Sequence, residues 1–220
     1  MAINNVRENS SVAVAKEIKK SKSAFREYAE SIAFALLLAL FIRSFIVQAF
    51  KIPSGSMIPT LQVGDHILVN KLSYGIRNPF WGSYLAHFKK PQRGEVVVFI
   101  FPEDRSKDFI KRVIGIEGDV VEIREKKIYI NGRPLEDLHA HFEGDPPERG
   151  AFNVRDDYGP RQVPEHHIFV MGDNRDRSYD SRYWGFVDLN DVKGRAFLIY
   201  WSWDGTDRWV RWERIAGLIY

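Results

Sequence analysis

The feature that most constrains this chain is a single long apolar stretch near its N-terminus. The run from Ile32 to Ile42 contains no polar side chain, and alone it is too short to cross a hydrocarbon core of about 30 Å. Extending it to 28–48 gives a helix of about 21 residues and about 31 Å. The extension includes Glu30 at one end and Arg43 near the other, where a long cationic side chain can reach the headgroups. We therefore predict a transmembrane anchor over 28–48 rather than a buried core helix.

The charges around this stretch predict its orientation. Basic residues precede it with few acids among them, namely Lys16, Lys19, Lys20, Lys22 and Arg26. An excess of Lys and Arg marks the cytoplasmic side of a membrane helix, so we expect a cytoplasmic tail over 1–27, a single pass, and a domain over 49–220 on the outer face. A cleaved signal peptide is the alternative, but Val47-Gln48-Ala49 is a poor small-x-small exit.

Composition excludes some classes of function. The net charge is +3 and the pI about 9.0, yet no block of Lys and Arg alternates with aromatic residues as a nucleic-acid surface requires. We therefore expect no nucleic-acid partner. Cysteine is absent, which excludes disulfides and thiolate metal sites.

The exported part is predicted to be mainly β. Short β-branched or alternating runs are typical of strands, and they occur at 66–70, 95–101, 120–124, 127–130, 168–171 and 196–201. Asn131-Gly132 indicates a tight hairpin turn. The segment of about 135–165 is rich in Gly, Pro and charge, and we expect it to be a small inserted subdomain. The Trp- and Arg-rich C-terminal part suits either the headgroup layer or an edge of the core.

A hydroxyl-bearing turn, Pro53 to Leu61, follows the predicted anchor and offers a candidate nucleophile. A serine becomes nucleophilic when a neighbouring base takes its proton. A Ser-His-Asp triad stays open, because its members need only meet in space, although Gly-x-Ser-x-Gly is missing. His139 and His141 form a possible metal pair, but no further ligand motif accompanies them, and we predict a solvated loop there.

A lysine base is the second option, and it needs burial to lower its pKa from about 10.4. In a strand, Lys111 shares one face with Phe109 and Val113, which surrounds the amine with apolar side chains. Arg112 then lies on the opposite face, where we expect it to reach solvent. A third segment, 171–185, combines glycine with Asp and Asn turn formers and can hold rigid carboxylates near the amine.

These three segments, in this order after an N-terminal anchor, resemble the boxes of bacterial type I signal peptidases over about residues 43–185. The resemblance implies that Ser56 is the nucleophile, Lys111 the general base, and Ser54 a hydroxyl donor to the oxyanion hole. It also implies that Ser178 hydrogen-bonds the lysine amine. Asp180 and Arg182 would be structural residues near the site. The strand box beginning at Arg93 carries Glu95 where the family usually has Asp.

The same resemblance implies a β-barrel catalytic domain with a hairpin or loop insertion, located at a bacterial inner membrane. The implied enzyme is a serine endopeptidase that cuts exported preproteins after small-x-small sequences and needs no metal or other cofactor. Its partners would be those preproteins and the lipid bilayer, and we expect a monomer. The implied specificity pockets use Phe50, Ile52, Met57, Leu61 and Ile110. Two alternatives stay open: a specialised processing peptidase of the same chemistry, and a membrane-tethered β-domain without catalysis.

Overall fold

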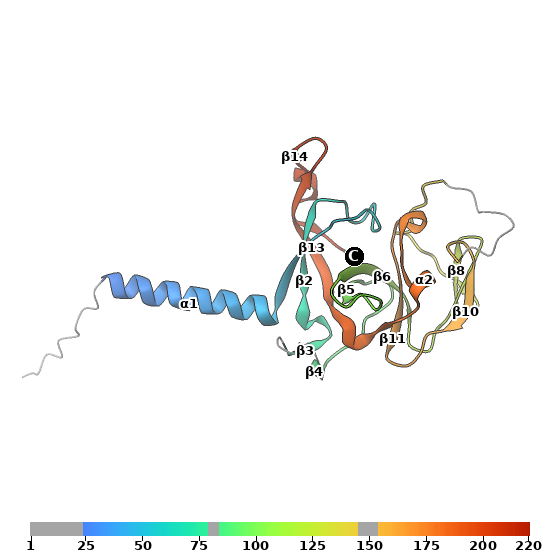
Figure 1. Cartoon of the computed structure of the whole chain (residues 1–220), viewed down its shortest axis with the longest axis horizontal. Helices are drawn as coiled ribbons and strands as arrows, with labels where there is room; N and C mark the ends of the chain where they lie inside the picture. The colour runs from blue at the N-terminus through green and yellow to red at the C-terminus, as the bar shows by residue number, and fades with distance from the viewer. Residues whose placement is uncertain (1–23, 79–83, 145–153) are drawn as a thin grey trace, which may run out of the picture. The chain divides into compact units, whose positions relative to one another are not determined.

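The computed structural model describes residues 24–78, 84–144 and 154–220 (Figure 1). The chain contains two compact units, Met1–Ala39 and Leu40–Tyr220. Most of the expected cytoplasmic tail, residues 1–23, lies outside the described residues, as does part of the expected insertion, residues 145–153.

The predicted anchor is a helix, α1, that begins at Ala24 and ends at Phe45. Within the described residues, Phe25–Phe45 is the one segment long and apolar enough to cross a membrane. The helix ends three residues earlier than we expected, because Val47–Lys51 forms strand β1 instead. This strand pairs antiparallel with β2, with Val47 opposite Asn70. Backbone pairing with a neighbouring strand therefore sets the end of the helix.

The second unit is mainly β, as predicted, and its large antiparallel sheet curls into a half-barrel (Figure 1). In spatial order its main strands are β1, β2 (Asp65–Asn70), β13 (Val192–Asp204), β5 (Val96–Ile100), β6 (Asp108–Ile116), β11 (His167–Met171) and β12 (Val187–Asp188). The short strands β14 (Trp209–Val210) and β15 (Gly217–Leu218) also pair with β13. The long strand β13 shifts register at several points along its partners. Such bulges bend a strand and increase its twist, which lets the sheet curl.

Both faces of the central strands are buried, and alternation along each strand explains how. In β5, Val96 and Val98 enter one core cluster, which also contains Met57 and Ile67. Val97, which lies between them, enters a second cluster on the opposite face. Successive residues of a strand point to opposite faces. The sequence of β5 is therefore continuously apolar because each face covers a different part of the core.

A second antiparallel sheet packs beside the first, and its strands show that the inserted subdomain begins earlier than we expected. Its strand order is β10 (Tyr158–Gln162), β7 (Val120–Arg124), β8 (Lys127–Ile130) and β9 (Arg133–Pro134). The predicted tight turn is confirmed, since Ile130 pairs with Arg133 across Asn131-Gly132. Strand β10, which we assigned to the insertion, pairs with β7, which we assigned to the main domain. In the described residues the inserted subdomain therefore begins with β7, at Val120, and not at about 135.

Two smaller elements complete the described part of the unit. A hairpin of β3 (Gly75–Arg77) and β4 (Tyr84–His87) forms a separate two-stranded sheet. A single-turn helix, α2 (Ser181–Trp184), follows the loop after β11. Short 3-10 turns are η1 (Lys71–Ser73), η2 (Arg175–Arg177), η3 (Leu189–Asp191) and η4 (Trp212–Arg214). The turn η2 and helix α2 shape the loop that contributes to the site below.

Candidate active site

The predicted nucleophile loop follows β1 and is held by two buried side chains that come after Ser56. Met57 and Leu61 are fully buried in the main core, and the Leu61 N–H donates to the Met57 carbonyl over 2.8 Å. Ser54, by contrast, is exposed. Ser56 lies between these extremes and is 8% exposed. The alternation of small polar and large apolar residues thus anchors the loop while leaving the serine at its surface.

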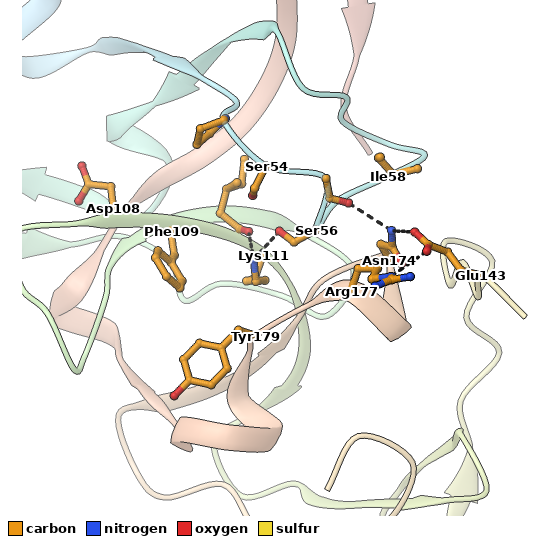
Figure 2. Close-up of a pocket in the computed structure, with 13 residues that line it drawn as sticks. Ser54, Ser56, Ile58, Asp108, Phe109, Lys111, Glu143, Asn174, Arg177 and Tyr179 are labelled. Carbon is orange, nitrogen blue, oxygen red and sulfur yellow. Dashed lines mark hydrogen bonds and ion pairs between the residues drawn. The ribbon is translucent and has the colours of Figure 1, made fainter. Parts of the chain in front are cut away.

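Strand β6 places Lys111 directly against this serine (Figure 2). The Lys111 Nζ lies 2.7 Å from the Ser56 Oγ and 3.1 Å from the Ile110 carbonyl oxygen. It also lies 5.4 Å from the centre of the Phe109 ring, as expected for residues on one strand face. Lys111 is 4% exposed. A hydroxyl and an amine at this separation can exchange a proton without further movement.

Burial lowers the pKa of Lys111 from 10.5 to about 8. The carboxylates of Asp180 and Asp173 oppose this change by favouring the charged amine, and the Arg182 guanidinium adds to it. Desolvation is the largest of these effects, because a charged amine loses its hydration in an apolar surrounding. A lysine in this environment can act as a base near neutral pH.

Arg112 differs from our expectation that it reaches solvent. It is 1% exposed, and its Nε and Nη2 donate to the two carboxylate oxygens of Asp173 over 2.8 and 2.7 Å. Its Nη1 donates to the Gly94 carbonyl over 2.6 Å. The Thr60 hydroxyl donates to the same carboxylate over 2.6 Å, which joins the nucleophile loop to the loop after β11. The prediction was wrong because the loop after β11, the nucleophile loop and the C-terminal residue Tyr220 all supply partners to Arg112.

The loop after β11 holds the predicted pair Asp180 and Arg182 in the interior. Asp180 is fully buried, accepts from the Gly172 N–H over 3.1 Å and pairs with the Arg182 Nε over 2.8 Å. Burial alone would raise the pKa of Asp180, but the Arg182 charge and the hydrogen bonds hold it below its usual value. These contacts fix the loop to the single turn of α2.

Ser178 is buried next to the nucleophile loop, but it lacks the bond that we predicted. Its Oγ makes no hydrogen bond to the Lys111 amine in the described residues, although it lies close enough to the Asp180 carboxylate to help lower the pKa of that group. Gly172 explains how closely the segments approach. A Cβ added to Gly172 would lie 2.3 Å from the Ser178 Oγ and 2.4 Å from the Ser56 carbonyl oxygen. Only glycine fits between these two segments.

A cavity of about 440 Å³ opens over the serine and the lysine (Figure 2). Its lining comprises Pro53, Ser54, Gly55, Ser56, Ile58, Asp108, Phe109, Ile110, Lys111, Glu143, Asn174, Arg177 and Tyr179. Ser54, the predicted oxyanion donor, is among these lining residues. No histidine is among the described residues that line it, which argues against a Ser-His-Asp triad. In the same described ranges, no group of three or more His, Asp or Glu side chains is arranged to hold a metal ion.

The five predicted specificity residues lie in two different settings. Of the five, Ile110 alone lines the cavity. Ile52, Met57 and Leu61 are at most 2% exposed and pack in the core cluster against which Ile110 and Phe50 lie. They support the cavity from below and do not face it. Apolar residues beside a nucleophile look alike in sequence whether they line a pocket or lie under it.

The cavity also uses residues that sequence reasoning missed. Ile58 and Phe109 provide apolar wall, and their positions next to the serine and the lysine could have indicated them. Asn174, Arg177 and Glu143 were not predicted. Asn174 lies in the third motif, but nothing in its local sequence reveals that its N–H donates to the Ser56 carbonyl over 3.1 Å.

Several known proteins are similar to this chain in sequence. A model of the family described as signal peptidase, peptidase S26, matches residues 25–201. A signal peptidase I of Pseudomonas fluorescens is 41% identical over 207 residues, which cover 80% of this chain and 72% of that protein. A probable signal peptidase I-2 of Synechocystis sp. is 38% identical over 207 residues, covering 91% of this chain and 83% of that protein. A crystal structure of a signal peptidase I from Enterococcus faecalis is 36% identical with a TM-score of 0.41, covering 49% of this chain and 97% of that one.

Proposed function

Because the chain belongs to the peptidase S26 family of signal peptidases, we propose that it cleaves preproteins with a catalytic dyad of Ser56 and Lys111. The family membership makes it a serine peptidase that removes signal peptides from preproteins. The observation that carries the dyad is the 2.7 Å separation between the Lys111 Nζ and the Ser56 Oγ. The lowered pKa of Lys111, about 8, supports it.

The reaction follows from these two groups. The neutral Lys111 amine accepts the Ser56 hydroxyl proton while the Oγ attacks the carbonyl carbon of the scissile bond. When the C–N bond breaks, the Lys111 ammonium returns that proton to the leaving amine. Lys111 next takes a proton from water, the resulting hydroxide attacks the acyl ester, and the proton returns to the Ser56 Oγ. The serine and the amine are then as they were at the start.

Ser54 and the Ser56 N–H are the proposed donors to the oxyanion. Ser54 is exposed and lines the same cavity, and the Ser56 N–H donates to no main-chain carbonyl in the described residues. Both groups are therefore available to a negative oxygen that forms above the serine. Loss of one such donor typically lowers a rate by about 10²–10³-fold.

The proposed cleavage preference is for small residues at the first and third positions before the cut. Ile58, Phe109 and Ile110 contribute partly buried apolar wall to the cavity. Shallow apolar pockets accept alanine and exclude larger side chains. Asp180 and Arg182 keep their proposed role as structural residues.

The membrane setting is the second part of the proposal. The apolar helix α1 fits a membrane-anchored enzyme, and we infer a single-pass anchor in a bacterial inner membrane. The basic tail before it would be cytoplasmic, and the second unit, a monomer, would face outward against the bilayer. The indoles of Trp203, Trp209 and Trp212 are 41%, 67% and 62% exposed and suit a headgroup layer. A substrate held by its own apolar helix would then arrive already positioned.

Replacement of the two dyad residues tests the proposal. Ser56→Ala and Lys111→Ala should each fail to restore preprotein processing in a peptidase-depleted bacterial strain. Ser106→Ala and Lys127→Ala alter an exposed serine and an exposed lysine outside the cavity, and both should restore it. A membrane-tethered β-domain without catalysis would tolerate all four changes. Processing by either dyad variant would show that the assignment is wrong.

A further inference from the structure

Four consecutive side chains of the loop after β11 bond to the inserted subdomain. Asn174 and Arg177 share one partner, Glu143: the Asn174 Nδ2 donates to its Oε1 over 2.8 Å, and the Arg177 Nε donates to its Oε2 over 2.8 Å. Figure 2 shows these three side chains together at one side of the cavity that contains Ser56.

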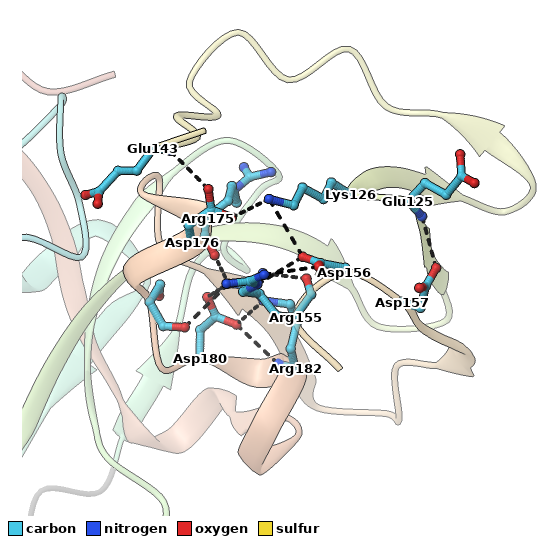
Figure 3. A network of polar contacts seen from close by, with 11 residues as sticks. Glu125, Lys126, Glu143, Arg155, Asp156, Asp157, Arg175, Asp176, Asp180 and Arg182 are labelled. Atoms are coloured by element: carbon cyan, nitrogen blue, oxygen red, sulfur yellow. Dashed lines mark hydrogen bonds and ion pairs between the residues drawn. The ribbon is translucent and has the colours of Figure 1, made fainter. Parts of the chain in front are cut away.

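The two residues between them bond to the same subdomain (Figure 3). Arg175 pairs with Asp137, and the Lys126 Nζ donates to the Asp176 carboxylate over 2.8 Å. The Glu143 N–H donates to the other oxygen of Asp176 over 3.0 Å. Glu143 is exposed, but it is held at its own main chain as well as at both oxygens of its carboxylate.

Asn174 connects Glu143 to the nucleophile loop. Its N–H donates to the Ser56 carbonyl over 3.1 Å, and its Nδ2 also donates to the Gly55 carbonyl over 3.4 Å. Asn174 is 1% exposed, and its Oδ1 has no hydrogen-bond partner in the described ranges. Only its donors orient the amide, and the strongest acceptor that it meets is the Glu143 carboxylate, since bonds to ionised groups are the stronger ones.

We propose that Glu143 is a positioning residue of the peptidase, which acts through Asn174 to hold the main chain at Gly55 and Ser56. This proposal rests on the proposed Ser56–Lys111 dyad. Correct placement of the serine matters because small displacements from the attacking geometry cost large factors in rate. The inserted subdomain thereby becomes part of the catalytic apparatus, although it supplies no group that touches the reacting atoms.

The test measures kcat and KM of the full-length enzyme on a peptide with an Ala-x-Ala cleavage site. Glu143→Ala should lower kcat about tenfold, the factor that about 1.4 kcal/mol of barrier corresponds to, and should leave KM nearly unchanged. Glu143→Gln keeps an oxygen that accepts from Asn174 and should retain kcat within about twofold of the wild type. Glu136→Ala is the matched control, because it removes an exposed acid of the same subdomain.

A double-mutant cycle tests whether Glu143 acts through Asn174. If Glu143 acts through Asn174, the double variant Glu143→Ala, Asn174→Ala should be no slower than Asn174→Ala alone. Multiplied losses, a Glu143→Gln variant as slow as Glu143→Ala, or a Glu143→Ala variant as fast as the control would each overturn the proposal. Ser56→Ala distinguishes a failure of the dyad proposal from a failure of the positioning proposal. Residual cleavage by Ser56→Ala would contradict the dyad. An inactive Ser56→Ala variant together with a Glu143→Ala variant of normal activity would contradict only the positioning role.

Discussion

The pH dependence of cleavage follows from the buried amine. Lys111 accepts the serine proton only when it is neutral, and burial lowers its pKa from 10.5 to about 8. At pH 7 a pKa of about 8 leaves about one tenth of the molecules with a neutral amine, compared with about three in ten thousand at the ordinary value. The lowered pKa therefore raises the fraction of molecules with a neutral Lys111 amine about 300-fold at pH 7. Below pH 8 the rate should fall about tenfold for each unit of pH.

The assay is kcat/KM on an Ala-x-Ala peptide between pH 5.5 and 10 at constant ionic strength, because this ratio reports the groups of the free enzyme. The acidic limb should bend near pH 8. Lys127→Gln removes an exposed lysine and should leave the limb in place, and Lys111→Arg should be inactive, since arginine does not lose its proton in proteins. A rate that stays constant from pH 6 to 9, or one that still rises tenfold for each unit of pH up to pH 10, would refute the reasoning.

Four further outcomes are expected. Ser54→Ala should lower kcat by about 10²–10³-fold with little change in KM, as measured by steady-state kinetics. Gly172→Ala should abolish cleavage, because the new Cβ would lie 2.4 Å from the Ser56 carbonyl oxygen. Wild-type activity of this variant would contradict the close approach of Gly172 to the nucleophile loop. Arg112→Met should lower the free energy of unfolding by about 3–5 kcal/mol in urea denaturation, since it leaves a buried carboxylate unpaired. Lys111→Met should instead raise the free energy of unfolding by up to about 3 kcal/mol at pH 7, because in the wild type the unfolded chain binds the Lys111 proton more tightly than the folded chain does. This gain over the wild type should shrink as pH rises from about 8 to 10.5.

The sequence predicted individual strands better than their arrangement. Runs such as 95–101 and 168–171 are apolar and β-branched, and strands formed at both. Nothing local shows that β7 and β8 belong to a second sheet in which β7 also pairs with β10, because strand pairing depends on residues far apart in the chain. The end of α1 was misplaced for the same reason: Val47 is apolar enough for either state, and the pairing of β1 with β2 decides between them.

The candidate site shows a similar division. The motifs identified Ser56 and Lys111, whose mutual contact agrees with the predicted roles. They did not reveal the environment of Arg112, since an alternating pattern tells which face a side chain takes and not what covers that face. The bond between Asn174 and Glu143 joins the loop after β11 to the inserted subdomain, and no spacing rule connects the two residues.

Lys111 and Arg112 together show why burial alone does not decide the state of a cation. The two neighbours on β6 are 4% and 1% exposed. Arg112 meets both oxygens of the Asp173 carboxylate, so its charge is compensated where it lies. Lys111 meets a hydroxyl, a peptide carbonyl and an aromatic ring, and among the described residues no carboxylate lies within ion-pair distance of it. The same desolvation therefore produces a structural ion pair on one face of the strand and a proton acceptor on the other. It follows that a carboxylate introduced beside Lys111 would raise its pKa and remove the base without changing its position.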